Sequence, residues 1–265
     1  MSVVASDEVM QLASTMGEAS SCMDSIAERV GQVRQRLLQA ARGAKRDPEK
    51  IRLVAVSKRK PIEDIRAAYA EGLRDFGENY VQELEQKAEA LADLPDLRWH
   101  MIGHLQRNKA RHVVRHASTV QTVDTVQLVR ELGRRAADVP VAEPRRFGVD
   151  GRLVVLVEVN VGGEEQKSGC DPGDLGEVLE AIESEPALAL AGLMTVPPHT
   201  EDPAGAQPFF AELVRLRDLH GGAERLPELS MGMTHDLEYA VAAGATMVRI
   251  GTAIFGERPP KPAGL

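Results

Sequence analysis

The feature that most constrains this chain is a regular alternation of short apolar stretches with longer amphipathic ones, which continues for roughly 230 of its residues. Strands are expected at 51–57, 74–78, 97–102, 119–123, 153–159, 188–196, 228–233 and 247–255. Helices are expected at 21–43, 61–71, 80–92, 105–116, 125–137, 175–182, 206–220 and 236–243. This order predicts a single-domain α/β fold, a (β/α)8 barrel of the TIM type with an extra N-terminal helix. A doubly wound open sheet is less well supported, because no glycine-rich dinucleotide fingerprint follows the first strand.

The segments around this alternation are interpreted from their composition. Residues 1–20 are small, polar and unpatterned, so a mobile N-terminal tail is expected before a barrel domain that covers 21–258. Residues 259–265 are expected to form a C-terminal tail, and 138–151 an exposed loop. Trp99 is expected in the core. The helix at 206–220 is expected to turn four side chains inward, namely Phe209, Leu213, Leu216 and Leu219.

Charge and cysteine content argue against several classes of protein. The net charge is −8 and the pI is about 5.5, whereas general nucleic-acid or membrane-surface binding usually needs a basic face. Cys22 and Cys170 cannot build a disulfide framework or a zinc site. The N-terminus lacks a signal-peptide pattern, and no apolar run approaches the ~18 residues of a membrane span. A cytoplasmic monomer without nucleic-acid or membrane partners is expected.

The residues that end the strands of a barrel line one rim, where the sites of barrel proteins lie. The expected rim is rich in hydrogen-bonding groups and poor in carboxylates: Lys58, Asn79, His104, Asn160, Thr195, Thr234, Gly251 and Thr252. His100 and His104 are four residues apart but lack a metal-binding pattern, so a structural or surface role is expected for both, and no metal site.

Lys58 follows the first predicted strand and is the candidate anchor for an aldehyde cofactor. Strand alternation places it on the same side as Val54 and Val56. Arg59 and Lys60 would lower its pKa and favour the nucleophilic amine. The plainer interpretation is a solvated charge at the start of a helix, and the local pattern alone does not separate the two.

Two glycine-containing turns follow the seventh and eighth predicted strands, where barrels commonly bind phosphate. In the first, Gly232 precedes Thr234 at the start of a helix, a place suited to an anion. In the second, Gly251 allows backbone N–H groups to approach a ligand closely. The alternative is that both glycines only make turns. Finding them in adjacent loops favours a phosphate site.

Arg249 lies inside an apolar predicted strand, and buried arginines are rare unless they are paired. It is either a structural ion-pair residue or one that faces a ligand. A rim lysine together with a phosphate site suits pyridoxal phosphate, and equally a class I aldolase. The residues alone leave these two chemistries open.

Six segments, in this order, resemble the pyridoxal phosphate homeostasis protein family. They are AVSKRKP (55–61), FGENYVQE (76–83), WHMIGHLQRNK (99–109), GLMT (192–195), LSMGMT (229–234) and VRIGTAIFG (248–256). The resemblance runs from about residue 26 to 258 and implies a barrel like the N-terminal domain of bacterial alanine racemase. The N-terminal tail and the 138–151 loop lie outside it.

The resemblance implies that Lys58 holds pyridoxal 5'-phosphate as an internal aldimine and that Arg249 faces the pyridine nitrogen. It assigns the phosphate to Thr234, Gly251 and Thr252, and it places Asn79 near the ring. Thr234 stands where many members have serine, and both side chains offer a hydroxyl. Lys167 matches a second lysine motif, NVGGEEQKSG (160–169), for which a surface role is an equal alternative.

The expected function is therefore that of a carrier and buffer of pyridoxal phosphate, which releases it to apo-enzymes and has no catalytic residues. An arginine at the pyridine nitrogen disfavours its protonation and makes the ring a poorer electron sink. Racemisation needs a base on each face of the substrate carbon. Alanine racemases take the second base, a tyrosine, from a separate C-terminal domain, which is expected to be absent here. Tyr69, Tyr80 and Tyr239 are on predicted helices and are poor substitutes. An amino-acid racemase is the main alternative, and a phosphosugar aldolase the third.

Overall fold

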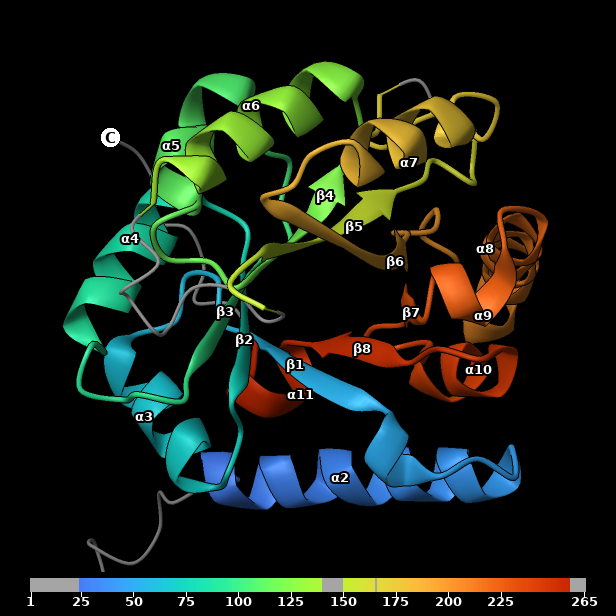
Figure 1. The fold of residues 1–265 in the computed structure, drawn as a ribbon. Coiled ribbons are helices and arrows are strands. Elements are labelled where there is room, and N and C mark those ends of the chain that lie inside the picture. The colour runs from blue at the N-terminus through green and yellow to red at the C-terminus, as the bar shows by residue number, and fades with distance from the viewer. Residues whose placement is uncertain (1–23, 140–149, 165, 258–265) are drawn as a thin grey trace, which may run out of the picture.

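The structure, a computed structural model, describes residues 24–139, 150–164 and 166–257. Eight parallel strands form a closed barrel in the order of the sequence, and β1 pairs with β8 to close it (Figure 1). The strands are β1 (Arg52–Val56), β2 (Asp75–Glu78), β3 (Arg98–Met101), β4 (Thr119–Val123), β5 (Leu153–Glu158), β6 (Leu188–Met194), β7 (Glu228–Ser230) and β8 (Met247–Ile250). The predicted barrel is confirmed.

Helices surround the barrel and connect its strands (Figure 1). They are α2 (Ile26–Gly43), α3 (Ile62–Ala70), α4 (Val81–Ala90), α5 (Ala110–Val113), α6 (Val126–Ala137), α7 (Leu175–Glu183), α8 (Gln207–Leu219), α9 (Gly222–Arg225), α10 (Leu237–Ala243) and α11 (Thr252–Phe255), with 3-10 turns η1 (Pro48–Lys50), η2 (Arg107–Lys109) and η3 (Pro203–Ala206). The extra helix α2 begins with a capping box between Ser25 and Glu28 and packs against α3, α10 and α11.

The ends of several elements differ from the sequence-based expectation. Residues 252–255, predicted to continue the last strand, form the helical turn α11, because the backbone of Gly251 leaves the extended region. The helix predicted at 105–116 is reduced to η2 and the four-residue α5, and α9 was not predicted. The tails predicted at 1–20 and 259–265, and most of the 138–151 loop, lie outside the described residues.

The prediction for the inward face of α8 was partly wrong. Leu213 and Leu216 are buried as expected, but Phe210 is buried in place of Phe209, and Leu219 is 67% exposed. Two consecutive phenylalanines leave the helical period ambiguous by one position, and α8 ends at Leu219, beyond the surface that it covers. Trp99 is buried and packs against Phe76, as expected for a core residue.

The apolar core lies between the strands and the surrounding helices, whereas the inside of the barrel holds several polar side chains. Asp75, His100, Gln121, Ser230 and Arg249 are each at most 6% exposed. Each is on a strand, and their side chains are joined by hydrogen bonds. The sheet therefore encloses a polar interior, with the larger hydrophobic cluster outside it.

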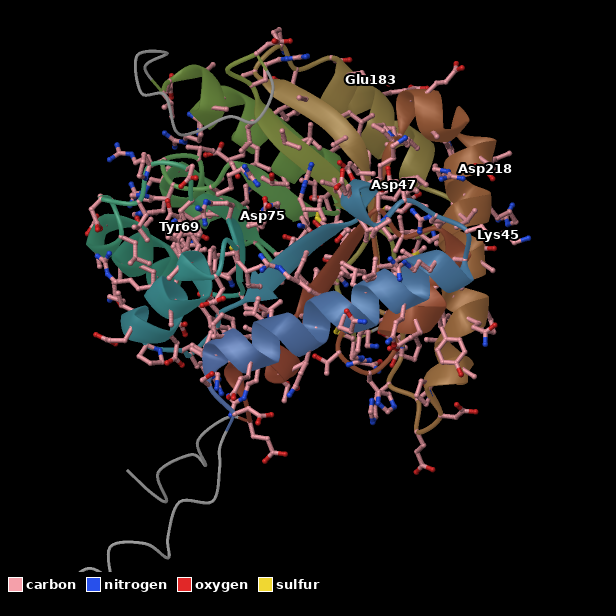
Figure 2. The ribbon with its side chains drawn as sticks, turned by 90° about the horizontal axis from the view of Figure 1, so that it is seen from below. Lys45, Asp47, Tyr69, Asp75, Glu183 and Asp218 are labelled. Carbon is pink, nitrogen blue, oxygen red and sulfur yellow. The ribbon has the colours of Figure 1, made fainter. Side chains whose placement is uncertain are left out.

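At the amino-terminal end of the strands the barrel opens into a cavity of about 520 Å³. Its charged lining includes Arg52, Arg98, Arg152, Asp75 and Glu228, each at or near the start of a strand. Figure 2, which is turned by 90° from Figure 1, labels Asp75 inward of Tyr69. Among the described residues, no helix is long and apolar enough to cross a membrane.

Candidate functional site

Lys58 lies two residues after the end of β1, in a turn that is fixed on its N-terminal side by a buried ion pair. Lys87, on α4, is 2.7 Å from Glu78 Oε1 and donates a 2.8 Å hydrogen bond to the carbonyl oxygen of Ser57. The Ser57 hydroxyl donates to the same carboxylate at 2.7 Å. Glu78 is fully buried, and burial raises its pKa even though Lys87 opposes the shift. The residue before Lys58 is thus held by both its side chain and its backbone.

The residues after Lys58 are held as well. Arg59 has a φ of 59°, a conformation that costs energy for a side chain other than glycine, and its N–H donates to Glu83 at 2.6 Å. The ammonium of Lys60 donates to the carbonyl oxygens of Phe255 and Gly256 at 2.7 and 3.1 Å, at the end of α11. The guanidinium of Arg59 donates to the hydroxyl of Tyr80 at 3.2 Å, so both neighbouring cations have partners of their own. Their predicted effect on the pKa of Lys58 stays a prediction.

The two predicted phosphate turns lie beside each other and beside the end of β1. Thr234 Oγ1 accepts a 3.4 Å hydrogen bond from the N–H of Ala253, in the first turn of α11. Gly232 has a φ of 93°, and a Cβ there would overlap Ala240. A Cβ at Gly251 would lie 3.4 Å from Val56. The structure thus brings the turn after β7, the start of α11 and the strand that leads to Lys58 into one place.

The extra helix α2 supports this turn from outside the barrel. Arg36 donates a 3.0 Å hydrogen bond to the carbonyl oxygen of Thr234 and forms a 2.9 Å ion pair with Glu238 on α10. Arg29, also on α2, lies so close to Gly256 after α11 that a Cβ at Gly256 would be 2.8 Å from its side chain. The contact of α2 with the predicted phosphate turn could not be foreseen from the sequence, because it depends on which helices become neighbours.

Arg249, on β8, is buried, with only 4% of its surface exposed. Its guanidinium donates 2.7 and 2.8 Å hydrogen bonds to two neutral acceptors, the hydroxyl of Ser230 and the carbonyl oxygen of Thr195. Burial lowers its pKa to about 10, so it remains charged at neutral pH. Of the two interpretations left open by the sequence, these neutral partners favour an arginine whose charge serves a ligand.

Glu158, the last residue of β5, was not predicted as a site residue. It is 8% exposed, and its Oε2 has no hydrogen-bond partner. Burial raises its pKa to about 7, Arg249 opposes this shift, and Asp124 adds to it. A sequence signal was present, since Glu158 interrupts an otherwise apolar strand, as Arg249 does in β8. The site therefore contains a carboxyl group that holds or loses its proton near neutral pH.

Two other residues singled out from the sequence, Asn79 and Lys167, form no hydrogen bond or ion pair with the Lys58 turn or the Thr234 turn within the described part of the chain. Asn79 is half-buried in a hollow that His104 also lines, and the β1–β2 register, which aligns Val56 with Gly77, brings it level with Lys58. Lys167 forms an ion pair with Glu164 and donates to the carbonyl oxygen of Pro197 at 3.2 Å, which ties the loop after β5 to the loop after β6. These contacts account for Lys167 without a ligand.

The donor set fits a phosphorylated aldehyde. A lysine in a fixed turn supplies an amine, and the hydroxyl of Thr234 beside the start of α11 supplies donors for a phosphate. The buried guanidinium of Arg249 and the unpartnered oxygen of Glu158 remain for a ring. Within the described part of the chain, no group of three or more His, Cys, Asp or Glu side chains could hold a metal ion.

Comparison with known proteins then decides the family. Residues 29–259 match the family described as alanine racemase, N-terminal domain. The pyridoxal phosphate homeostasis protein of Pseudomonas aeruginosa is 46% identical over 89% of this chain and 97% of its own length. This chain belongs to the pyridoxal phosphate homeostasis protein family. The proteins of that name from Aquifex aeolicus and Bos taurus are 42% and 40% identical over 87% and 85% of this chain, and over 97% and 85% of their own lengths.

Solved structures agree with the barrel fold of this homeostasis protein family. The structure of PipY from Synechococcus elongatus with PLP bound has a TM-score of 0.71 and 37% sequence identity, and covers 88% of this chain and 100% of its own. Alanine racemase from Corynebacterium glutamicum has a TM-score of 0.61 at 17% identity, and covers 91% of this chain and 62% of its own. The second likeness concerns the fold alone.

Proposed function

We propose that this chain binds pyridoxal phosphate covalently through Lys58 and acts in the homeostasis of this cofactor. Bound pyridoxal phosphate supplies an aldehyde that condenses reversibly with a primary amine and releases water. The observation that carries the proposal is the fixed turn around Lys58, which lies beside the Thr234 turn and α11. The PLP-bound relative at 37% identity supports it.

The residues have distinct roles in this proposal. Lys58 supplies the amine. Thr234, Gly251 and Thr252 bind the phosphate through a hydroxyl and the N–H groups at the start of α11. Arg249 presents its charge to the ring nitrogen, and Asn79 lies level with Lys58 at the edge of the site. A guanidinium that remains charged keeps a proton off the ring nitrogen, which weakens the ring as an electron sink.

The test is an absorbance titration of the purified protein with pyridoxal phosphate. The parent protein is expected to develop the band of a lysine-linked cofactor, and Lys58→Ala is expected to abolish it. Lys50→Ala, in the exposed turn η1, is the matched control and should retain the band. A band that survives in Lys58→Ala would refute the assignment of Lys58.

We further propose that the protein holds and releases the cofactor without efficient catalysis. Racemisation needs a second base, and the hydroxyl of Tyr69 is engaged with Asp96, while Tyr80 is 44% exposed. Release to a pyridoxal phosphate-dependent apo-enzyme in the cytoplasm is expected to restore that enzyme's activity. Racemisation of single-enantiomer alanine by the parent protein, lost in Lys58→Ala, would favour the racemase alternative.

A further inference from the structure

A continuous chain of hydrogen-bonded side chains crosses the interior of the barrel, starting at Arg249. The guanidinium of Arg249 donates to the hydroxyl of Ser230 at 2.7 Å, and Ser230 donates to Gln121 Oε1 at 2.6 Å. Gln121 Nε2 lies 2.9 Å from His100 Nδ1. These four residues come from β8, β7, β4 and β3, and each is at most 4% exposed. The chain is therefore shielded from water along its length.

The chain ends at the cavity on the amino-terminal side of the barrel. His100 Nε2 is 2.9 Å from Asp75 Oδ1, and Asp75 also accepts two hydrogen bonds from Arg98, at 2.9 and 2.6 Å. Arg98 is half-exposed and lines that cavity. Burial would raise the pKa of Asp75, but the hydrogen bonds from Arg98 and His100 outweigh it and lower the pKa. Asp75 is thus a carboxylate at neutral pH.

The chemistry of the end groups fixes the direction of every hydrogen bond in the chain. An arginine can only donate, so the hydroxyl of Ser230 accepts from Arg249 and donates its own hydrogen to Gln121. A carboxylate can only accept, so His100 donates from Nε2 to Asp75. In a neutral imidazole Nδ1 must then accept, which matches the amide nitrogen that it faces. Charged Arg249 and charged Asp75 thus specify one tautomer of His100.

Any reversal inside the chain leaves a buried group without a partner. If the amide of Gln121 turned around, its nitrogen would face the hydroxyl of Ser230, which already accepts from Arg249. The hydroxyl hydrogen would then lose its acceptor in the chain, and His100 would have to carry a second proton to supply the amide oxygen. An unsatisfied buried donor is unfavourable, so the arrangement is specific.

We propose that Ser230, Gln121 and His100 are positioning residues that aim the Arg249 guanidinium at the cofactor ring. The inference rests on the proposed function, because it takes Arg249 to face the cofactor. Ser230 touches Arg249 directly, and Gln121 and His100 act through it by holding the hydroxyl in the orientation that accepts. The interior of the barrel is thus an extension of the cofactor site, anchored at the opposite mouth by Asp75 and Arg98.

The experiment compares pyridoxal phosphate affinity and the absorbance maximum of the bound cofactor in interior variants of the full chain. Gln121→Met keeps an unbranched side chain of similar length but breaks the hydrogen bonds on both sides. It is expected to weaken affinity about five- to tenfold, the size of one or two lost net hydrogen bonds, and to shift the maximum. Ser230→Ala is expected to act in the same direction. Thr119→Val is the matched control and should change neither the affinity nor the absorbance maximum. Thr119 is on β4 and is buried beside the cavity at the amino-terminal end of the barrel.

Gln121→Glu is the conservative variant, because its carboxylate still accepts from Ser230 and can take a hydrogen from a doubly protonated His100. It is expected to restore affinity to within about twofold of the parent protein. The inference is overturned if Gln121→Met and Ser230→Ala lower only the melting temperature while affinity and maximum stay unchanged. An equal loss in Thr119→Val would overturn it too. If instead the parent protein forms no lysine-linked band, the proposed function fails. That outcome differs from a failure of the positioning role, in which the parent protein forms the band and the interior variants bind pyridoxal phosphate equally well.

Discussion

At the amino-terminal mouth of the barrel, Asp75 and Glu228 form ion pairs with arginines. At the carboxyl-terminal rim, by contrast, the Oε2 atom of Glu158 has no hydrogen-bond partner among the described residues. Asp75 is paired with Arg98 at 2.6 Å, and Glu228 with Arg52 at 3.3 Å. At the rim, Arg249 is held by neutral acceptors. Charges at the mouth are therefore satisfied within the protein and contribute to stability. At the rim, Glu158 keeps an oxygen without a hydrogen-bond partner and Arg249 is bound to neutral groups, an arrangement that costs stability and that we propose serves a ligand.

The largest effect is expected at the Lys87–Glu78 ion pair next to the Lys58 turn, where the rim, like the mouth, holds a paired carboxylate. Lys87→Met would leave the fully buried Glu78 without its cation, and should lower the free energy of unfolding by about 3 to 5 kcal/mol in urea titrations. Lys50→Met, in the exposed turn η1, is the control, with an expected change within about 0.5 kcal/mol. A change below about 1 kcal/mol in Lys87→Met would show that the rim tolerates unpaired buried charge here too.

Glu158→Gln is expected to stabilise the cofactor-free protein at pH 8. Glu158 has a pKa of about 7 in the fold against an ordinary 4.5, so its stabilising contribution is present below pH 4.5 and lost as the pH rises to about 7. The shift corresponds to an upper limit of about 3 kcal/mol at pH 8. The gain in Glu158→Gln should shrink as the pH falls from 7 to 4.5. A gain that is independent of pH over this range would contradict the account.

Asp75→Asn also replaces a carboxylate by a carboxamide, at the opposite mouth of the barrel. Here the substitution is expected to destabilise the protein, whereas Glu158→Gln is expected to stabilise it. The carboxylate of Asp75 accepts hydrogen bonds from Arg98 and His100, and the amide can accept with only one of its two terminal atoms. The free energy of unfolding should fall by about 2 kcal/mol, a loss that is limited because Arg98 is half-exposed. Because the pKa of Asp75 is lowered, this contribution is present above pH 3.8 and lost only in stronger acid. Equal signs for the two variants at pH 8 would break the comparison.

The smallest effect is expected at Arg36, which on α2 donates a hydrogen bond to Thr234 in the proposed phosphate turn. Arg36→Met should weaken pyridoxal phosphate binding about threefold and change stability by less than about 1 kcal/mol, because its ion pair with Glu238 is partly exposed. An absorbance titration measures the affinity. Arg34→Met, an exposed position on the same helix, is the control. Equal affinities for the two variants would argue that α2 supports the fold alone.

The sequence predicts the barrel well because each strand produces a local apolar signal, which needs no knowledge of distant partners. Strand ends are less predictable. The strand ending at Phe255 was predicted too long, since a short helix after Gly251 is as apolar as a strand. The face of α8 was misjudged at Phe209 because Phe210 offers the same apolar signal one position later.

The candidate site was predicted only as far as its residues end strands or make turns. Lys58, Thr234 and Gly251 could be placed on one rim by that rule. Gln121 could not, since its importance comes from contacts across the barrel, between strands far apart in the sequence. Glu158 ends β5 and so meets the rule, but the strand was predicted to continue to Val159. For His100 the sequence favoured a structural or surface role; the structure buries it with hydrogen bonds to Asp75 and Gln121, which agrees with the structural role and excludes the surface one.

The most direct measurement is reduction of the pyridoxal phosphate-loaded protein with borohydride, followed by peptide mass mapping. Borohydride converts a lysine–cofactor C=N bond to a stable amine, which marks the residue that held the aldehyde. The account predicts one major adduct, on Lys58, that is absent from Lys58→Ala. A major adduct on Lys167 or another lysine, or no adduct at saturating cofactor, would contradict it.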